Sequence, residues 1–224
     1  MNMKGSGKGK PREISGFDGG VGWIAYPDEE MQRASHALAT EAGVLLIDPV
    51  DAEGVEELYA DLGDVAGVCL LLDRHERDAV TFADRHDVPV YAPTWMDGVP
   101  SDRGREAEPL ADLLADTDYA VEAVQNSSIW QEAALVDEAG GTLLVPEALG
   151  TAGYFRAGDE PLGVHPMLRL TPPTRLREFD VERVLVGHGA GVREDGTAAV
   201  RDAVDNARRR APAAYLGALK QLLP

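Results

Sequence analysis

Apolar residues in the first hundred positions fall into short blocks separated by polar turns. Some blocks are continuous runs, such as VAGVCLLL, which is typical of a buried strand. These blocks predict four strands, at 19–26, 43–50, 65–72 and 88–94. Apolar residues that recur every three or four positions predict two helices, at 53–62 and 76–86. The resulting alternation predicts an α/β (α+β) fold in which helices cover sheets.

The segment between the first two strands has two readings. Its Ala, Leu and Glu content and the glycine that ends it favour a helix over 28–42. The run SHALAT at 35–40 also alternates in a way that suits one strand of a hairpin. Propensity alone favours the helix, and the hairpin strand remains the alternative.

The second half of the chain contains shorter strands and more irregular segments. Three strands are expected at 119–124, 133–136 and 141–145, the last two joined by a turn at DEAGG. Segments 100–108 and 152–174 are polar or rich in Gly and Pro, and are expected to be loops. A buried strand then runs into His188, which lies between two glycines. Two closing helices are expected at 197–210 and 212–223, the second starting at Pro212.

Composition narrows the function classes. The chain has 224 residues and a net charge of −18, which argues against nucleic acid as a partner because phosphate contacts need a basic face. No apolar stretch approaches the roughly 20 residues of a membrane span, and the start MNMKGSGKGK lacks a signal-peptide core. We therefore expect a cytoplasmic protein that does not bind membranes, with a flexible basic tail at 1–14 and one domain at 15–224.

The charged residues are distributed unevenly between types. Three of the four lysines lie in the tail, and elsewhere all basic residues but Lys220 are arginine. An acid-rich, lysine-poor surface resembles that of salt-loving archaeal proteins, in which concentrated salt screens the acidic self-repulsion. The alternative is an ordinary acidic protein. The lone Cys69 cannot form an intrachain disulfide and is expected in the core.

Four motifs occur in an order that resembles the metallo-β-lactamase superfamily. They are LIDP, which contains Asp48, then LLLDRHERDA, LLVPEALG and a late GHG. The resemblance spans about residues 15 to 195 and implies a four-layer αββα sandwich, with two mixed sheets face to face and helices outside. It also implies that residues 34–42 are strand and turn, and we adopt that reading.

In that superfamily a motif H-x-H-x-D-H supplies most ligands of a two-zinc site. The resemblance places Asp73, His75, Arg77 and Asp78 on its four ligand positions. The middle-strand histidine is missing, because that region reads VQNSSIW. The bridging aspartate corresponds to Glu147, and the closing histidine to His188. Two of the usual histidines therefore remain.

One interpretation is a rebuilt, carboxylate-rich metal site. Asp73, His75 and Asp78 occupy a strand end and a first helical turn, so they can point into one mouth. A shared Glu147 would give two clusters, Asp73–His75–Glu147 and Asp78–Glu147–His188. Such a set suits one divalent zinc, manganese or iron ion. A metal-bound hydroxide would then hydrolyse an ester, thioester, amide or phosphoester.

The opposing interpretation rests on Arg77, a permanent cation where the superfamily keeps a metal-binding carboxylate. A guanidinium about 4 Å from a divalent ion would repel it by several kcal/mol at an effective dielectric near 20. Arg77 could instead hold Glu147, Asp78 or Asp73 in the metal's place. We prefer this interpretation: an eroded metal centre without dinuclear zinc hydrolase activity, in a binding or interaction module that takes a small-molecule ligand. If the protein is active, Arg77 and Asp78 are the catalytic candidates.

The remaining features have simpler structural readings. His36 is expected in the core and His86 at a helix C-terminus, where an imidazolium favours the dipole. His165 lies in the irregular stretch and is a candidate for a pocket wall. The chain contains no phosphate-binding GxxxxGK[ST] loop and no GxSxG elbow. Tyr215, Leu216, Leu219 and Leu222 line one helix face, which either packs on the sandwich or docks a second copy as a homodimer.

Overall fold

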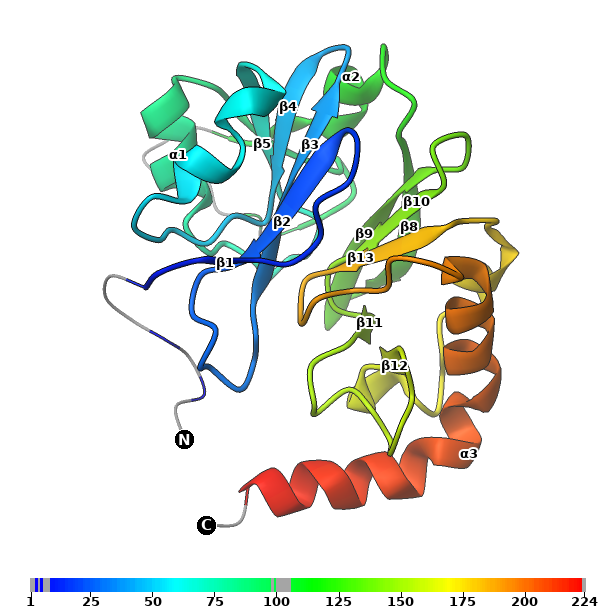
Figure 1. Cartoon of the computed structure of the whole chain (residues 1–224). Helices are drawn as coiled ribbons and strands as arrows, with labels where there is room; N and C mark the ends of the chain where they lie inside the picture. Colours follow the sequence, from blue (N-terminus) through cyan, green and yellow to red (C-terminus); the bar gives the residue numbers. More distant parts are fainter. Residues whose placement is uncertain (1–2, 4, 6–8, 98, 100–105, 223–224) are drawn as a thin grey trace.

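The structure is a computed structural model that describes residues 3, 5, 9–97, 99 and 106–222. Its first sheet has seven strands that follow one another in sequence order (Figure 1). They are β1 (Arg12–Glu13), β2 (Gly20–Ile24), β3 (Ala34–Thr40), β4 (Gly43–Ile47), β5 (Val65–Cys69), β6 (Val90–Ala92) and β7 (Glu108–Pro109). The strands from β1 to β4 pair antiparallel, and those from β4 to β7 pair parallel.

The second sheet faces the first and has the order β13-β10-β9-β8. Its strands are β8 (Ala120–Ser127), β9 (Trp130–Asp137), β10 (Thr142–Val145) and β13 (Arg183–Val186). Strands β10 and β13 are parallel, so their carboxyl ends lie at the same edge of the sheet. A small separate ladder pairs β11 (Leu149–Gly150) with β12 (Gly163–Val164).

A helix covers the outer face of each sheet, as Figure 1 shows. The α-helices are α1 (Ala79–His86), α2 (Leu110–Leu114) and α3 (Gly196–Leu222). Four described 3₁₀ segments are η1 (Val55–Leu58), η2 (Ala60–Leu62), η4 (Pro166–Leu168) and η5 (Thr174–Glu178). Helix α1 packs on the first sheet and α3 on the second. The expected four-layer αββα sandwich is therefore confirmed.

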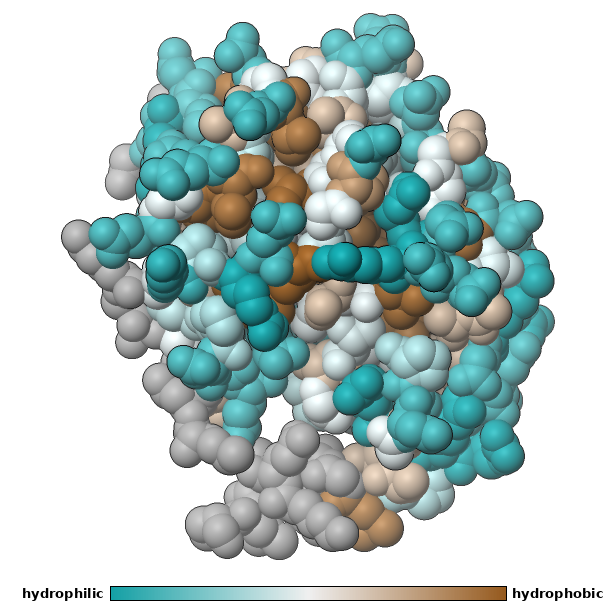
Figure 2. Space-filling model, viewed as in Figure 1, coloured by the Kyte–Doolittle hydropathy of each residue, from teal (hydrophilic) through white to brown (hydrophobic). Residues whose placement is uncertain are grey.

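Three apolar cores hold these layers together. The core between the sheets joins residues of β3, β4 and β5, such as Leu45, to residues of β9, β10 and β13, such as Leu144. A second core lies between the first sheet and α1, around Phe82, and a third lies between the second sheet and α3. Hydrophilic side chains cover much of the face in Figure 2, and hydrophobic ones gather over the first sheet. No helix among the described residues is long and apolar enough to cross a bilayer.

Segment 28–42 contains strand β3, so the helix favoured by propensity is wrong. β3 pairs with β2 on one side and β4 on the other, with His36 opposite Gly22 and Ile47. The first five residues of β3 are buried. Pairing on both edges and burial outweigh the helix propensity of Ala and Leu, which is a weak preference.

The helix expected at 53–62 is also wrong in kind. The segment forms two short 3₁₀ turns, η1 and η2, separated at Tyr59, whose φ is −120°. Val55 and Tyr59 are still buried against the first sheet. A spacing of three to four residues suits both helix types, so spacing alone could not separate them.

The two helices expected at the C-terminus are one helix, α3. Pro212 lies inside it rather than at a start. Figure 1 shows that α3 changes direction along its length, and an internal proline accounts for such a bend because it lacks an N–H and crowds the preceding turn. The predicted face includes Leu219 and Leu222, whose side chains lie outside the described part of the chain.

Two further expectations concern the chain ends and loops. Arg12 and Glu13 form β1, and Ile14 is buried, so the last residues of the expected tail belong to the sheet. Most of the loop expected at 100–108 lies outside the described residues, and its last residue, Glu108, starts β7.

Candidate metal centre

Two histidines and one glutamate meet where strands of both sheets end. His75 follows β5, Glu147 follows β10, and His188 follows β13. Their ligand atoms lie within 4.8 Å of one another. His75 Nε2 is 3.0 Å and His188 Nε2 is 2.9 Å from the same atom, Glu147 Oε2. His75 and His188 are 7% and 1% exposed, so the group is almost dry.

The outer nitrogen of each ring is fixed by an acceptor. His75 Nδ1 is 3.0 Å from Asp48 Oδ2, and the other oxygen of Asp48 accepts from the Leu71 N–H. His188 Nδ1 is 2.8 Å from the carbonyl oxygen of Met31. A carbonyl oxygen can only accept and the carboxylate is an acceptor, so both Nδ1 atoms carry a proton. In neutral rings both Nε2 atoms therefore present lone pairs.

Three lone pairs consequently converge at one place, from two imidazoles and one carboxylate. Lone pairs facing each other at about 3 Å repel unless a cation lies between them. Two protons, one on each Nε2, or one divalent ion would supply the same charge of +2. The donors therefore fit a divalent metal, and two histidines with one glutamate match the protein ligands of single-zinc hydrolytic sites.

The charges around the triad shift its pKa values in opposing directions. Burial and Arg77 push the pKa of His75 down, but Asp48 and Glu147 outweigh them, so it is raised. Burial dominates for His188, whose pKa is lowered. Burial would raise the pKa of Glu147, but the hydrogen bonds and charges of His188 and His75 hold it far below its usual range. Glu147 is therefore a carboxylate.

Arg77 does not hold the carboxylates that the sequence suggested. Its guanidinium donates to three backbone carbonyls: Ala34 O, Asp48 O at 2.8 Å and Gly187 O at 3.1 Å. The backbone of Arg77 is left-handed, with φ of +43°. This unusual conformation turns the long side chain into the seam between the sheets. The expectation that Arg77 binds Glu147, Asp78 or Asp73 is therefore wrong.

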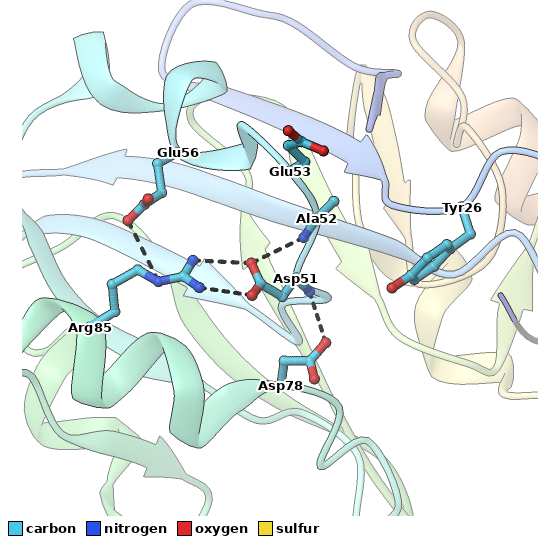
Figure 3. Close-up of a pocket in the computed structure, with 7 residues that line it drawn as sticks. All are labelled: Tyr26, Asp51, Ala52, Glu53, Glu56, Asp78 and Arg85. Atoms are coloured by element: carbon cyan, nitrogen blue, oxygen red, sulfur yellow. Dashed lines mark hydrogen bonds and ion pairs between the residues drawn. The ribbon is translucent and has the colours of Figure 1, made fainter. Parts of the chain in front are cut away.

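Asp73 and Asp78 lie outside the triad. Asp73 accepts from the Gln131 N–H at 3.1 Å and from Arg74. Asp78 accepts from the Asp51 N–H at 2.8 Å, in a pocket of about 480 Å³ that it shares with the Asp51–Arg85 ion pair (Figure 3). Neither of the two clusters proposed from the sequence forms, because each of them needs one of these aspartates.

His165, which the sequence suggested as a pocket-wall residue, lies beside the triad. His165 Nε2 is 3.4 Å from Glu147 Oε1, and its Nδ1 accepts from the Met167 N–H. Burial lowers the pKa of His165 to about 4, so the ring is neutral at pH 7 with its proton on Nε2, toward Glu147. His165 was predicted only to line a pocket, and the structure places it directly beside the Glu147 carboxylate.

Glu132 holds the backbone at Glu147 in place through hydrogen bonds. Its Oε1 accepts the N–H groups of Glu147 and Ala148, each at 2.7 Å, and its Oε2 accepts from Trp130 Nε1. Burial raises the pKa of Glu132 to about 7, although those N–H donors favour the carboxylate. The motif WQEA gives no sign of this function, because the acid reads as one residue of an ordinary strand.

The other histidines lie where simpler readings put them. His36 is buried, and its Nε2 is 2.9 Å from Val186 O. Burial lowers the pKa of His36 to about 4. His86 ends α1, with Nε2 3.0 Å from the Tyr59 hydroxyl.

Tyr154 completes the surroundings of the triad. Its ring meets that of His188 edge-on, with centroids 5.9 Å apart. Burial and the charge of Glu147 raise the pKa of Tyr154, so the hydroxyl keeps its proton.

Comparison with known proteins gives no match to a family model and none to a curated protein. Solved structures do match. TTHA1623, crystallised in a di-iron-bound form, is 20% identical with a TM-score of 0.54, covering 78% of this chain and 94% of its own. A metallo-β-lactamase from Erythrobacter litoralis is 13% identical with a TM-score of 0.58, covering 93% and 97%. FIM-1 from Pseudomonas aeruginosa, in a mono-zinc form, is 10% identical with a TM-score of 0.57, covering 97% and 98%.

The last two structures match more than nine tenths of this chain, and both are metallo-β-lactamases, which the four sequence motifs resemble. Identities of 20% and below establish the architecture alone. We conclude that the chain has the metallo-β-lactamase fold.

Proposed function

We propose that this protein is a single-metal hydrolase that binds one divalent ion at His75, Glu147 and His188. The observation that supports this most directly is the convergence of both Nε2 atoms on Glu147 Oε2, with each Nδ1 proton held by its own acceptor. Zinc suits this donor set best, and manganese or iron are also compatible with it. The substrate class is an ester, thioester, amide or phosphoester.

A divalent ion in such a site lowers the pKa of a bound water to about 7 and so supplies hydroxide near neutral pH. The residues of this chain prepare the site for it. Asp48 and the Met31 carbonyl fix the rings of His75 and His188 with Nε2 inward. Hydrogen bonds of this kind typically contribute 10- to 100-fold to metal affinity. His165 and Glu132 hold the side chain and backbone of Glu147.

Arg77 favours one ion over two. Its guanidinium is fixed by three carbonyls, and its charge acts on both Glu147 and Asp48. A second divalent ion would have to sit near this permanent cation. Asp73 and Asp78, which could have offset the repulsion, are engaged elsewhere. The proposed hydrolysis therefore uses one metal ion instead of two.

Metal analysis tests this function. We expect protein purified at high salt to hold one transition-metal ion per chain, and Glu147→Gln to lose it. Asp78→Asn is the control, because Asp78 is an acid from the motif that supplies His75 and it lies outside the triad. Metal-free wild type, or metal that persists in Glu147→Gln, would show the proposal to be wrong.

A second candidate follows from the burial of the triad. Because His188 is only 1% exposed, the metal of this second candidate would stabilise a binding module instead of activating a water. Hydrolysis separates the two. We expect the metal-loaded protein to cleave at least one of a panel of p-nitrophenyl esters and phosphoesters, and chelation to abolish the activity. Bound metal with no cleavage of the panel would favour the bracing role.

A further inference from the structure

Two hydrogen-bond donors beside the triad have no partner. The Tyr154 hydroxyl and Arg77 Nε are both buried without a hydrogen bond to any residue that the structure describes. Leaving a buried polar group unpaired is costly, and most such groups in folded proteins are paired with protein or with another bound molecule. Each of these donors could therefore take an acceptor from outside the chain.

The backbone places Tyr154 firmly against the metal centre. The N–H groups of Thr151 and Ala152 both donate to the carbonyl oxygen of His188, at 2.9 Å and 3.1 Å. Two residues later the Tyr154 ring meets the His188 ring edge-on and packs on Phe155 at 4.5 Å between centroids. The loop that carries the hydroxyl is thus tied to a metal-binding residue.

The charges around the hydroxyl define what it would bind. Glu147 and Arg77 are the two charged groups that act on it most strongly. Glu147 Oε2 is already occupied by two imidazoles and Oε1 faces His165. Tyr154 and Arg77 can each donate a hydrogen bond to a bound ligand. The matching ligand atom is an acceptor that carries full or partial negative charge, such as a carboxylate or carbonyl oxygen.

We propose that Tyr154 is a substrate-binding residue whose hydroxyl donates a hydrogen bond to a carboxylate or carbonyl oxygen held beside the metal triad. This inference rests on the proposed function, because the metal would bring that oxygen into reach. The hydroxyl is not a metal ligand in this scheme, so its removal leaves metal affinity unchanged.

Acetate is a suitable probe, since it offers a carboxylate oxygen and little else. We would load wild type, Tyr154→Phe and Tyr59→Phe with Co²⁺ and follow the visible absorption while titrating acetate. Loss of one hydrogen bond should raise the acetate dissociation constant about five- to tenfold in Tyr154→Phe. Tyr59→Phe is the matched control, because it removes a tyrosine hydroxyl that bonds His86 away from the triad.

Melting of the metal-free proteins gives an independent test. Tyr154→Phe removes a hydroxyl without a partner, so its melting temperature should equal or exceed that of wild type. Tyr59→Phe breaks a hydrogen bond and should melt about 2–4 °C lower. If Tyr154→Phe melts as low as Tyr59→Phe, the hydroxyl is bonded within the protein and the inference is wrong.

The outcomes separate this inference from the proposed function. A wild type that gives no Co²⁺ spectrum before acetate is added overturns both. A normal Co²⁺ spectrum with equal acetate affinity in wild type and Tyr154→Phe overturns the inference alone, and indicates that the hydroxyl is satisfied by solvent.

Discussion

The carboxylate of Asp48 decides which way the His75 ring presents its lone pair. In Asp48→Asn the side-chain amide has one oxygen for two donors, His75 Nδ1–H and the Leu71 N–H, so the NH2 group would have to face one of them and the fixed orientation of the ring would be lost. We expect metal affinity to fall about 10- to 100-fold, measured by competition with a chelator. Asp51→Asn is the control, because Asp51 pairs with Arg85 instead. Equal losses in the two variants would contradict the orienting role of Asp48.

Glu132 links the site to the pH dependence of stability. Burial raises its pKa from an ordinary 4.5 to about 7, so the folded protein binds this proton more tightly than the unfolded chain does. Its contribution to stability is therefore fully present below pH 4.5 and is lost as the pH rises through about 7. Glu132→Gln cannot titrate. We expect its melting temperature, measured between pH 5 and 8, to fall less steeply than that of wild type.

If the melting temperatures of wild type and Glu132→Gln change in parallel between pH 5 and 8, Glu132 stays ionised over that range. The raised pKa of His75 acts in the same direction in both proteins, so the difference between the curves isolates Glu132.

At the level of single residues, the sequence could predict the three donors but not their surroundings. The order of the four motifs predicted His75, Glu147 and His188, because each motif lies at the end of a strand and these strand ends meet in the fold. The engagement of Asp73, Asp78 and Arg77 depended on rotamers and on the left-handed backbone of Arg77, and no local pattern encodes these. Glu132 was unpredictable because a buried acid in a strand looks like an exposed one.

Among the elements, the turn after β13 leaves little room for a larger residue. Gly189 has φ of +99°, and an added Cβ would lie 2.3 Å from Thr151 Oγ1 and 2.6 Å from Ala152 N. Gly158 also has a positive φ, of +69°, but nothing within 4 Å of such a Cβ. We expect Gly158→Ala to cost about 1–2 kcal/mol of unfolding free energy from backbone strain alone. Gly189→Ala should cost more and also weaken metal binding, because the clash displaces His188.

Denaturant titration and chelator competition measure both effects. Similar unfolding free energies for the two alanine variants would mean that the loop at 151–152 yields easily, and that it does not hold His188 in place.

The type of an element, helix or strand, was predictable where the hydrophobic pattern of the sequence agreed with the strand pairing in the fold. Strands β4, β5, β9 and β10 were expected close to where they form, because continuous burial marks them. Strand β3 needed the family resemblance, since its local propensity is helical. The bend in α3 could not be foreseen either: a proline starts a helix or kinks one depending on what packs around it, and here Ala211 and Ala214 are buried on either side.

For the molecule as a whole, the excess of 39 acidic over 21 basic residues should make stability depend on salt. Like charges spread over one compact fold repel, and salt shortens the reach of that repulsion from about 10 Å at 0.1 M to about 3 Å at 1 M. We expect the melting temperature to rise as KCl increases from 0.05 to 1 M, most steeply below 0.5 M. A flat or falling curve would contradict the expected adaptation to a salty cytosol.

The spacing of the donors along the chain has a consequence for how the protein matures. Glu147 is 72 residues from His75 and 41 from His188, and each donor follows a different strand. A growing or unfolded polypeptide therefore offers no ready-made chelate, and closing loops of that length carries an entropic penalty before any ion is gripped. A metal ion at the proposed site could therefore not template folding. It would bind only once the two halves have come together, and its affinity would then add to the stability of the folded sandwich.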